Sequence, residues 1–539
     1  MAVNKVKKLK KLKIDNFFLE TGRNPTFLKF ATQPSAKGAY LTTYLSLTLA
    51  VLLSLCFTLI EGARRNAVRL EAECVTDIGL NSIFAEYNRA LFGRYNILAI
   101  DSSYCTDLAT VNNVKRHLQD YIERNTSMKG IAFSDFIYRD FLAMYPEKTE
   151  IADLMYLTDE NGRAFRKACI DAMEDDYGLD YLEQLKSWMT KIESEGYESY
   201  DAYSEKEELD DEIEEMVEEA QSEKTETVTN PDGTTSEVEI DYEEYESPTQ
   251  FIDEMHDSGI MALLFGNGEE LSNRRIEQDS LIKSRMQRGE VNKGSIPVEY
   301  EKTMEESLEK LLFIEYLGRY MAYYGAALES VNALPEYTEQ AALSYQLEEI
   351  VAGKGGDYEN LKSVAERLLF LRTAANTIYI LGDAEKREVA QILATAIAFL
   401  VACPEMADLL TTSILIGWAF AESVYDVRSL FKGSRVPLMK DDSTWHYGLE
   451  GALQFGKDGA EGFEDGMCYE DYLKVFMLML NKEEMTLRAM NLVEADMRIF
   501  AQNTHFRLDG CITELEATVT IGSAYGYSFE GKRRRKYSQ

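Results

Sequence analysis

The stretch that decides the fold is AYLTTYLSLTLAVLLSLCFTLI, residues 39–60, which contains no charged side chain. As a helix this run would be roughly 33 Å long, enough to cross the roughly 30 Å hydrocarbon core of a bilayer. No other uncharged run in the chain is as long. The sequence therefore predicts one transmembrane helix at residues 39–60, in contact with membrane lipid, followed by a separate folded body.

The charges on either side of this run indicate how it would cross the membrane. Residues 1–37 carry nine Lys or Arg and two acidic side chains, whereas the far side has three arginines offset by nearby glutamates. Basic flanks are retained in the cytoplasm. We therefore expect residues 1–38 to be a basic cytoplasmic segment of a single-pass protein of the cell membrane, with the C-terminal domain extracellular. A cleaved secretory signal is the alternative, although its apolar region is usually ~7–15 residues long.

The predicted helix has no obvious end at the membrane surface. From Glu61 to about Leu91 there is no proline, and the only glycines are Gly62 and Gly79. Small and apolar side chains recur there every three or four residues, which is typical of one helical stripe. We therefore expect a single long helix, half in lipid and half outside. A hinge at Gly62 followed by a separate amphipathic helix is the alternative.

The next part of the chain divides by composition. Residues 61–192 are expected to contain the exposed helix and the first part of an outer domain, with several helices over 106–192. Between residues 193 and 246 there are 23 acidic and two basic side chains. Like charges at that density resist compaction, so residues 193–247 are predicted to be an acidic insertion rather than core. Alternating apolar residues on both sides of Asn230-Pro231-Asp232-Gly233 predict a β-hairpin inside it.

Residues 248–511 are predicted to form the helical core of the outer domain. Gly353 is expected to end a helix over 341–352, and Asp357 is expected to cap the next one. Two further stretches, residues 389–404 and 409–421, contain no charged side chain. Both are too short to span a bilayer, so we expect them to be the central helices of the core.

Residues 512–539 are predicted to be a β-hairpin followed by a basic tail. Apolar side chains alternate with polar ones over 515–521 and again over 525–529, and RYNILAID at 94–101 is a candidate partner strand. The chain as a whole is therefore expected to be mainly α (α+β), with a small C-terminal antiparallel sheet. The tail is predicted to be solvated, or to contact the chain's own acidic surface or an anionic wall polymer. Its basic residues are Lys532, Arg533, Arg534, Arg535 and Lys536.

No catalytic, metal-binding or cofactor-binding motif stands out in the sequence. A GxSxG elbow is missing, and GYSFEGK at 526–532 lacks the Ser or Thr and the following helix of a phosphate loop. The formal net charge of −36 also disfavours nucleic acid as a partner. We therefore expect a protein that is not an enzyme and has no cofactor. The four histidines lack metal-ligand spacing and are expected to be structural: His117, His256, His446 and His505.

The segment IEGARRNAVRLEAECVTDIGLNSIFAEYN, which follows the apolar run, resembles the start of TadE/TadG-type minor pseudopilins of tight-adherence (Tad) pili. Their membrane helix ends in a Glu and an Arg about one turn apart, which Glu61 and Arg64 match. The resemblance makes this pair a candidate for assembly with other pilin-like membrane proteins. Pilin-type leaders are cut after a glycine and often have a Glu soon after the cut. Gly38 is the candidate glycine, but Thr43 stands where the Glu would be.

Most of the outer body resembles DUF5702, an uncharacterised family of Firmicute proteins often encoded with such pilus genes. The resemblance rests on FAEYNRALFGRYNILAID, ALSYQLEEIVAGKGGDYENLKSVAERLLFLRTAANTIYIL, ILIGWAFAESVYDVRSLFKGSRVPLMK and YEDYLKVFMLML. Together the two resemblances imply a membrane-anchored extracytoplasmic protein that is a structural or assembly component of a Tad-like pilus. An exported cell-wall-active enzyme and a pilus-independent surface adhesin are the alternatives.

Overall fold

The computed structural model describes most of the chain after residue 35. The chain divides into two compact units, Met1–Leu70 and Glu71–Gln539. Only the apolar part of one helix is described in the first unit, and the second unit is the folded body. The described residues are 36–126, 141–173, 179–222, 225–229, 235–239, 243–253, 259–265, 270–300, 306–326, 340–453, 463, 465–500 and 503–537.

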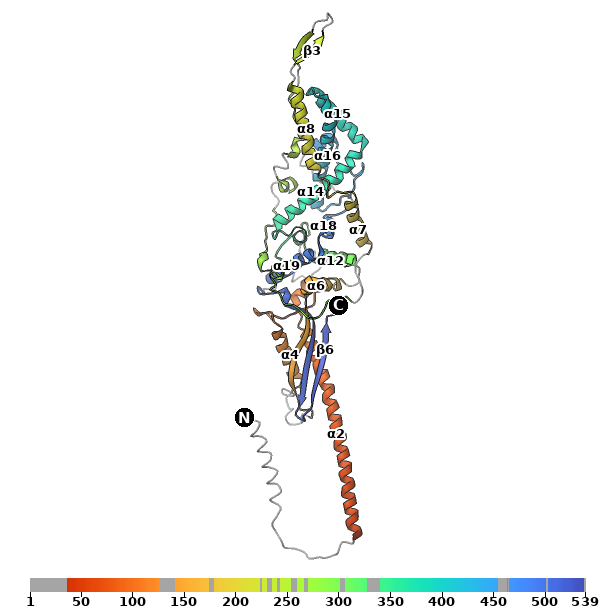
Figure 1. Cartoon of the computed structure of the whole chain (residues 1–539), viewed down its shortest axis with the longest axis vertical. Helices are drawn as coiled ribbons and strands as arrows, with labels where there is room; N and C mark the ends of the chain where they lie inside the picture. Colours follow the sequence, from red (N-terminus) through yellow and green to blue (C-terminus); the bar gives the residue numbers. More distant parts are fainter. Residues whose placement is uncertain are drawn as a thin grey trace. The chain divides into compact units, whose positions relative to one another are not determined.

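Helix α2 runs from Ala36 to Phe84 without interruption, a length of 49 residues (Figure 1). Among the described residues it is the one helix long and apolar enough to cross a membrane, with a mean hydropathy of 2.1 in an 18-residue window that is entirely unburied. The prediction of one continuous helix is confirmed, and there is no hinge at Gly62. The helix ends at Phe84 rather than near Leu91, because Asn88 caps a new helix, α3 (Arg89–Tyr95), by accepting a hydrogen bond from the Leu91 N–H.

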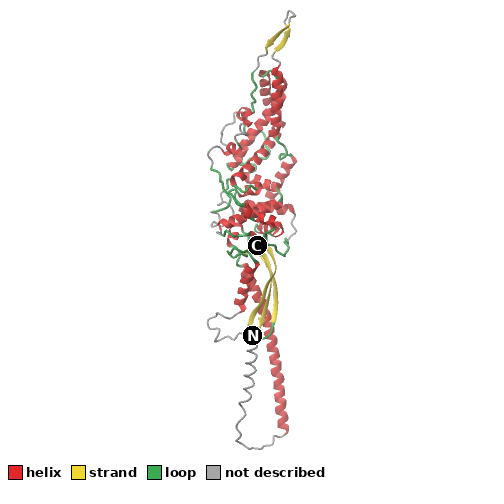
Figure 2. Cartoon of the chain, turned by 60° about the vertical axis from the view of Figure 1, so that its left-hand side comes forward, coloured by secondary structure: helices red, strands yellow, loops and turns green. Residues whose placement is uncertain are grey.

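An antiparallel sheet is built around strand β5, which pairs with three other strands. As predicted, alternate side chains of β5 from Leu515 to Ile521 are buried on one face. Ile100 lies opposite Ile512, so the predicted partner segment 94–101 does pair with the C-terminal strand, but only at its last two residues. Arg94 and Tyr95 of that segment lie in α3 instead. The buried face packs against the outer end of α2 and helix α4 (Figure 2). The elements are β1 (Ile100–Asp101), β2 (Met144–Tyr156), β5 (Cys511–Ser523), β6 (Ser528–Lys536) and α4 (Val111–Thr126).

Strand β2 corrects the prediction that residues 106–192 are all helical. It pairs with β5 from Met144, opposite Ser523, to Tyr156, opposite Ile512, with three register shifts. The sequence of β2 contains Pro146 and several charged residues and has no clean two-residue alternation. Its strand conformation therefore depends on backbone pairing with a distant partner, which a local pattern does not reveal.

The second strand of the C-terminal hairpin begins later than the alternation at Tyr525 predicts. Gly526, with φ of 88°, lies in the turn, and β6 starts at Ser528. Consequently all five basic residues over 532–536 lie within β6 rather than in a tail.

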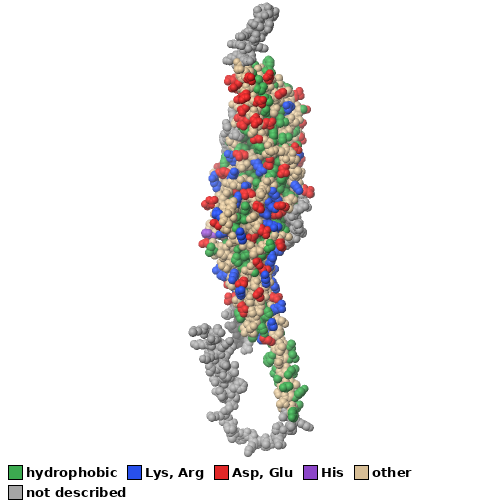
Figure 3. Space-filling model, viewed as in Figure 1, with side chains coloured by type: hydrophobic (Ala, Val, Ile, Leu, Met, Phe, Trp, Pro, Cys, Tyr) green, Lys and Arg blue, Asp and Glu red, His purple; other side chains and the backbone are tan. Residues whose placement is uncertain are grey.

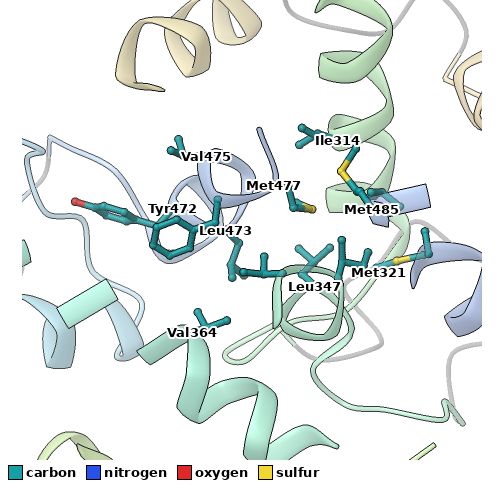
Figure 4. Close-up of a cluster of buried hydrophobic side chains, with 14 of the residues drawn as sticks. Ile314, Met321, Leu347, Val364, Tyr472, Leu473, Val475, Met477 and Met485 are labelled. Atoms are coloured by element: carbon teal, nitrogen blue, oxygen red, sulfur yellow. The ribbon is translucent and has the colours of Figure 1, made fainter. Parts of the chain in front are cut away.

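The largest hydrophobic core gathers side chains from most helices of the body. Figure 4 shows its centre, where Leu473 and Met477 of α18 lie among Ile314, Leu347 and Val364 of three other helices. The helices are α6 (Asp159–Asp171), α7 (Leu179–Ser194), α10 (Ile260–Phe265), α11 (Ile282–Arg288), α12 (Glu306–Tyr320), α13 (Gln346–Ala352), α14 (Asp357–Gly382), α18 (Tyr469–Met479) and α19 (Lys482–Phe500), with short 3-10 turns at η1 (Gln278–Ser280) and η5 (Leu508–Gly510).

Two helix boundaries in this core refine the sequence prediction. Helix α13 ends at Gly353, which has φ of 68°, as predicted, but it begins at Gln346 rather than at residue 341. Asp357 is the first residue of α14 and does not cap it. Its carboxylate instead accepts hydrogen bonds from the backbone N–H groups of Ser344 and Tyr345, so it fixes the approach to α13.

A second hydrophobic core lies between helices α8, α15, α16 and α17. Ile213 and Val217 of α8 are buried in it, so the prediction that the acidic segment stays outside the core is wrong for α8. One apolar face is enough to hold this helix, because its carboxylates project from the other side. The bounds are α8 (Ala202–Ser222), α15 (Ala384–Leu400), η4 (Pro404–Met406), α16 (Ala407–Phe431) and α17 (Leu449–Leu453).

The hairpin predicted within the acidic segment is present. Strands β3 (Thr225–Thr229) and β4 (Thr235–Glu239) pair in antiparallel fashion, with Thr225 opposite Glu239. The predicted turn residues 230–233 and the alternating residues Ile240 and Tyr242 lie outside the described residues.

Of the two uncharged stretches predicted to be central helices, only one is central. Helix α16 is buried along nearly its whole length, from Leu410 to Phe431. Helix α15 buries Ala390, Ala394 and Ala398 but leaves Ile392 and Phe399 exposed. The lack of charge therefore does not place α15 in the interior.

Candidate functional site

The residues predicted to mark the end of the membrane helix lie on α2. The Arg64 guanidinium donates a hydrogen bond to the Glu61 carboxylate at 2.9 Å, three residues earlier in the same helix. Gly38 lies in the first turn of α2. The spacing that the sequence singled out thus corresponds to an ion pair within one helix, which offsets both charges locally.

Three of the five basic residues of β6 form ion pairs with carboxylates of the chain itself. Arg533 contacts Asp77 at 3.2 Å and Glu73 at 3.4 Å, both on the outer part of α2. Lys532 and Arg534 pair with Glu516 and Glu514 of the neighbouring strand, and Arg535 is exposed. The contact with the chain's own acidic surface, one of the predicted alternatives, is therefore present. Contact with a wall polymer stays a prediction.

A buried network of charges joins α14, α16 and the loop after α16. Arg372 lies 2.8 Å from one carboxylate oxygen of Asp426, and the Lys440 ammonium lies 2.6 Å from the other. Lys440 also pairs with Glu422, and all four of these side chains are fully buried. Two positive and two negative charges thus balance one another in the interior, as buried charges require.

The pKa values in this network follow from burial and from the neighbouring charges. Burial alone would raise the pKa of Asp426, but the charges of Lys440 and Arg372 lower it below its ordinary value. Burial raises the pKa of Glu422 above its ordinary value, since only Lys440 strongly opposes it and Asp426 adds to it. Asp426 is consequently the ionised centre of the network.

The segments that carry the family resemblance converge on this network. Arg372 and Asn376 come from the segment ending in IYIL, and Asn376 donates a hydrogen bond to Asp426 at 3.0 Å. Asp426 and Lys440 come from the segment ILIGWAFAESVYDVRSLFKGSRVPLMK, and Tyr472 of the last segment contacts Arg372 at 3.2 Å. Sequence reasoning missed this role, although the acidic residues that directly follow the uncharged run at 409–421 were a visible signal.

Further buried polar contacts join the remaining resemblance segment to the core. Tyr95 donates a hydrogen bond to Asp496 at 2.5 Å, and Gln346 donates to the same carboxylate at 2.7 Å. Burial raises the pKa of Asp496. Burial also raises the pKa of Glu348 to about 7, although its carboxylate accepts hydrogen bonds from Tyr469 and the backbone. These contacts fix the packing of helices far apart in sequence.

The described histidines have aromatic or acidic neighbours. His117 stacks on Tyr104 and His446 stacks on Tyr425, each with ring centroids 3.8 Å apart. His505 lies 3.3 Å from Asp107, and His256 is outside the described residues. Across the described ranges no three His, Cys, Asp or Glu side chains are grouped so that they could hold a metal ion. All seven cysteines are free thiols.

A surface pocket of about 320 Å³ lies between α6 and the edge of the sheet. Four of its charged residues form ion pairs: Lys167 lies 2.6 Å from Asp171, and Arg534 pairs with Glu514. Glu299 and Lys536 also line the pocket. Two of its three carboxylates are therefore engaged by basic partners, which is unlike a pair of carboxylates held apart for acid–base work.

Comparison with known proteins finds a family match for the folded body of the chain. The model of a family of unknown function, DUF5702, matches residues 238–523, more than half of the chain. The matched range begins in β4 and ends with β5, so it includes the buried charge network and leaves out α2 and β6. No curated protein and no solved structure matches the chain.

Proposed function

The chain belongs to the DUF5702 family, and because the function of that family is unknown, we propose a function from the architecture of this chain. It is a membrane-anchored extracytoplasmic protein that serves as a structural or assembly component of a Tad-like pilus. The observation that carries the proposal is α2, one helix of 49 residues whose apolar part is unburied and whose outer end belongs to the folded body.

The apolar part of α2 is suited to lipid. Its large side chains between Tyr40 and Ile60 are exposed, an arrangement that favours hydrocarbon and disfavours water. Several of its hydroxyl groups donate within the helix: Ser46 donates to the Thr42 carbonyl at 2.6 Å, and Thr58 donates to the Ser54 carbonyl at 2.7 Å. A membrane helix needs such internal partners, because lipid offers none.

The direction of insertion follows from charge. The nine basic residues before residue 38 favour a cytoplasmic N-terminus, and the acidic body is then outside the cell membrane. The outer end of α2 is fixed to the sheet by buried Val75, Leu80 and Ile83 and by the ion pairs of Arg533. Anchoring of this kind suits a structural component, because the helix that enters the membrane is also part of the body's core.

Native cysteines provide a test of this topology. Cys74 and Cys105 are exposed on the body, whereas Cys169, Cys403 and Cys511 are buried. In intact protoplasts, a membrane-impermeant maleimide is expected to label the chain, and the C74S/C105S double variant is expected to lose most of the label. A cysteine introduced by Ser35→Cys in the double variant should react only after permeabilisation. Labelling of the S35C variant in intact protoplasts would overturn the topology.

The pilus association needs a separate test. A photo-crosslinking residue at Leu52, on the apolar part of α2, is expected to capture other pilin-like membrane proteins in cells that carry the pilus genes. The same residue at Leu108, exposed on the body, is the matched control. Deleting the pilus genes should remove the products at Leu52 without lowering the amount of the protein. Products that persist unchanged after the deletion would contradict the pilus role while leaving the membrane anchor intact.

A further inference from the structure

Helix α15 buries three of its alanines and exposes several of its large apolar side chains, whereas Leu393 and Ile397 are half-buried. Ala390, Ala394 and Ala398, at four-residue steps, are buried against α16. On the opposite side Ile392 is 67% exposed and Phe399 is 80% exposed. An outer helix of a protein in water normally has the reverse arrangement, with large apolar side chains inward and polar ones outward.

The exposed apolar residues of α15 have the spacing of a helix–helix contact. Val389, Ile392, Ala396 and Phe399 are all exposed and lie three, four and three residues apart. Alternating steps of three and four place side chains along one seam of a helix, as in the core positions of a coiled coil. These four residues, called here the α15 seam, are therefore shaped to receive another helix.

The C-terminal end of the α15 seam lies near the acidic helix α8 and the segment that follows it. Near its C-terminal end, the Gln221 amide of α8 donates to the Val401 carbonyl at 3.5 Å, and the Glu243 N–H donates to the Leu400 carbonyl at 3.1 Å. Figure 3 shows Asp and Glu side chains gathered where α8 lies in Figure 1. The exposed carboxylates of α8 are Glu207, Glu208, Asp211, Glu212, Glu214, Glu215, Glu218 and Glu219.

Basic side chains near the α15 seam do not neutralise this charge. The one lysine among the described residues of α8, Lys206, is buried and pairs with Asp210 and Asp253. Lys386 at the start of α15 pairs with Asp383 and Asp442. Arg387 is exposed, but it lies at the end of α15 away from α8's contacts. The net charge near the C-terminal end of the seam is therefore negative.

We propose that the α15 seam is a docking site for a cationic amphipathic helix of another protein. The seam supplies the apolar contact, and the carboxylates of α8 attract the basic flanks of the incoming helix. A second copy of this chain would instead bring its own eight exposed carboxylates to the same place, and like charges would repel. The proposal concerns the body alone and does not depend on the pilus assignment or on topology.

Synthetic peptides can test the proposal with the full chain in nanodiscs of zwitterionic lipid. The probe is a capped helical peptide with Leu at three- and four-residue steps and Lys at the flanking positions. Its controls are a peptide of the same composition with the Leu spacing scrambled, and one with Glu in place of Lys. Fluorescence anisotropy is expected to show affinity for the cationic amphipathic peptide at least about tenfold above both controls, weakening as salt is added.

Variants of the chain separate the two parts of the site. Ile392→Asp and Phe399→Asp should each weaken binding of the probe about tenfold, because exposed positions accept Asp without loss of folding but the seam loses its apolar contact. Glu218→Lys with Glu219→Lys should weaken binding several-fold and reduce its dependence on salt. Leu108→Asp, at an apolar residue that is 69% exposed elsewhere on the body, is the matched control and should bind as the wild type.

Other occupants of the seam would give different results. Equal binding of the scrambled or the anionic peptide would overturn the proposal. So would a dimer in light scattering that Ile392→Asp abolishes, because it would identify a second copy of the chain as the occupant. The full chain in nanodiscs, without peptide, can also be mixed with vesicles. Binding to the vesicles that Ile392→Asp abolishes would identify lipid as the occupant and would equally overturn the proposal.

Discussion

Helices α15 and α16 resemble each other in sequence and differ in position. Each contains an uncharged apolar run, and they pack against each other in the second core. Yet α16 is buried along nearly its whole length, including the charged Glu422 and Asp426, whereas α15 exposes Ile392 and Phe399. In this pair of helices, charged residues of α16 are buried and large apolar residues of α15 are exposed.

The difference shows that burial is set by partners rather than by apolarity alone. Asp426 is stable in the interior because Arg372 and Lys440 balance its charge and Asn376 donates a hydrogen bond to it. Helix α15 has a neighbour on only one side, so its other apolar side has no partner within the described body. Hydrophobic residues are not necessarily inside, and an exposed apolar stripe is the informative observation.

The largest expected effect is at the buried charges of α16. Asp426→Ala leaves Arg372 and Lys440 buried without their shared counter-ion, so we expect a loss of unfolding free energy of about 3–5 kcal/mol. Thermal unfolding of the full chain followed by circular dichroism measures it. Glu388→Ala on α15, an exposed carboxylate, is the matched control and should change the free energy by less than about 0.5 kcal/mol. Equal effects of the two variants would refute the contrast between the helices.

A matched pair of isoleucines compares the two helices directly. Ile414 of α16 is fully buried, and Ile392 of α15 is 67% exposed. Ile414→Ala removes buried apolar volume and leaves a cavity, so we expect a loss of about 3 kcal/mol. Ile392→Ala should change stability by less than about 0.5 kcal/mol. If Ile392→Ala destabilises the isolated chain as strongly as Ile414→Ala, the α15 seam is covered by the chain itself and is not free to bind a partner.

Local patterns in the sequence were sufficient to predict the helices and strands that depend on their own periodicity and end signals. The continuity of α2, the alternation of β5 and the end of α13 at Gly353 were all predicted from neighbouring residues. Strand β2 was missed because it is held by pairing with β5, more than 350 residues away. The distinction between α15 and α16 was also missed, because it depends on the number of neighbours in space.

The candidate site divides in the same way. The Glu61–Arg64 contact follows from a three-residue spacing on one helix, and a sequence pattern can predict it. The partners of Asp426 come from residues 372 and 440, on separate segments. No local rule brings them together. The position of the basic residues in β6 depends likewise on where the hairpin turns. Because the turn lies later in the chain than predicted, these residues belong to a strand and not to a tail.

Two glycines sharpen the comparison at the level of backbone packing. A Cβ on Gly417 of α16 would lie 2.6 Å from the Thr249 side chain, whereas a Cβ on Gly382, at the end of α14 before α15, would meet nothing within 4 Å. Gly417→Ala is therefore expected to cost about 1–3 kcal/mol through overpacking. Gly382→Ala should be neutral or stabilise the chain by up to about 1 kcal/mol. Urea denaturation of both variants measures the difference, and a neutral Gly417→Ala would show that α16 is less tightly enclosed than its burial indicates.

The smallest expected effect concerns how each helix begins. Asp383 caps α15 by accepting hydrogen bonds from the backbone N–H groups of Glu385 and Lys386, whereas α16 has no side-chain cap. Partial burial alone would raise the pKa of Asp383, but hydrogen bonds from the side chain and backbone of Lys386 lower it to about 2. Because the folded pKa lies below the ordinary value, the contribution of this carboxylate is fully present above about pH 4 and is lost as the pH falls toward 2.

Removing the cap should therefore destabilise α15 in a pH-dependent way. Asp383→Ala is expected to cost about 1 kcal/mol at pH 7, since water screens part of the ion pair with Lys386. Asp383→Asn retains a capping oxygen and should cost less. Thermal unfolding at pH 7, 4 and 3 checks the sign: the gap between the wild type and Asp383→Asn should be constant from pH 7 to about 4 and shrink at pH 3. A gap that grows on acidification would mean that the charge of Asp383 opposes folding.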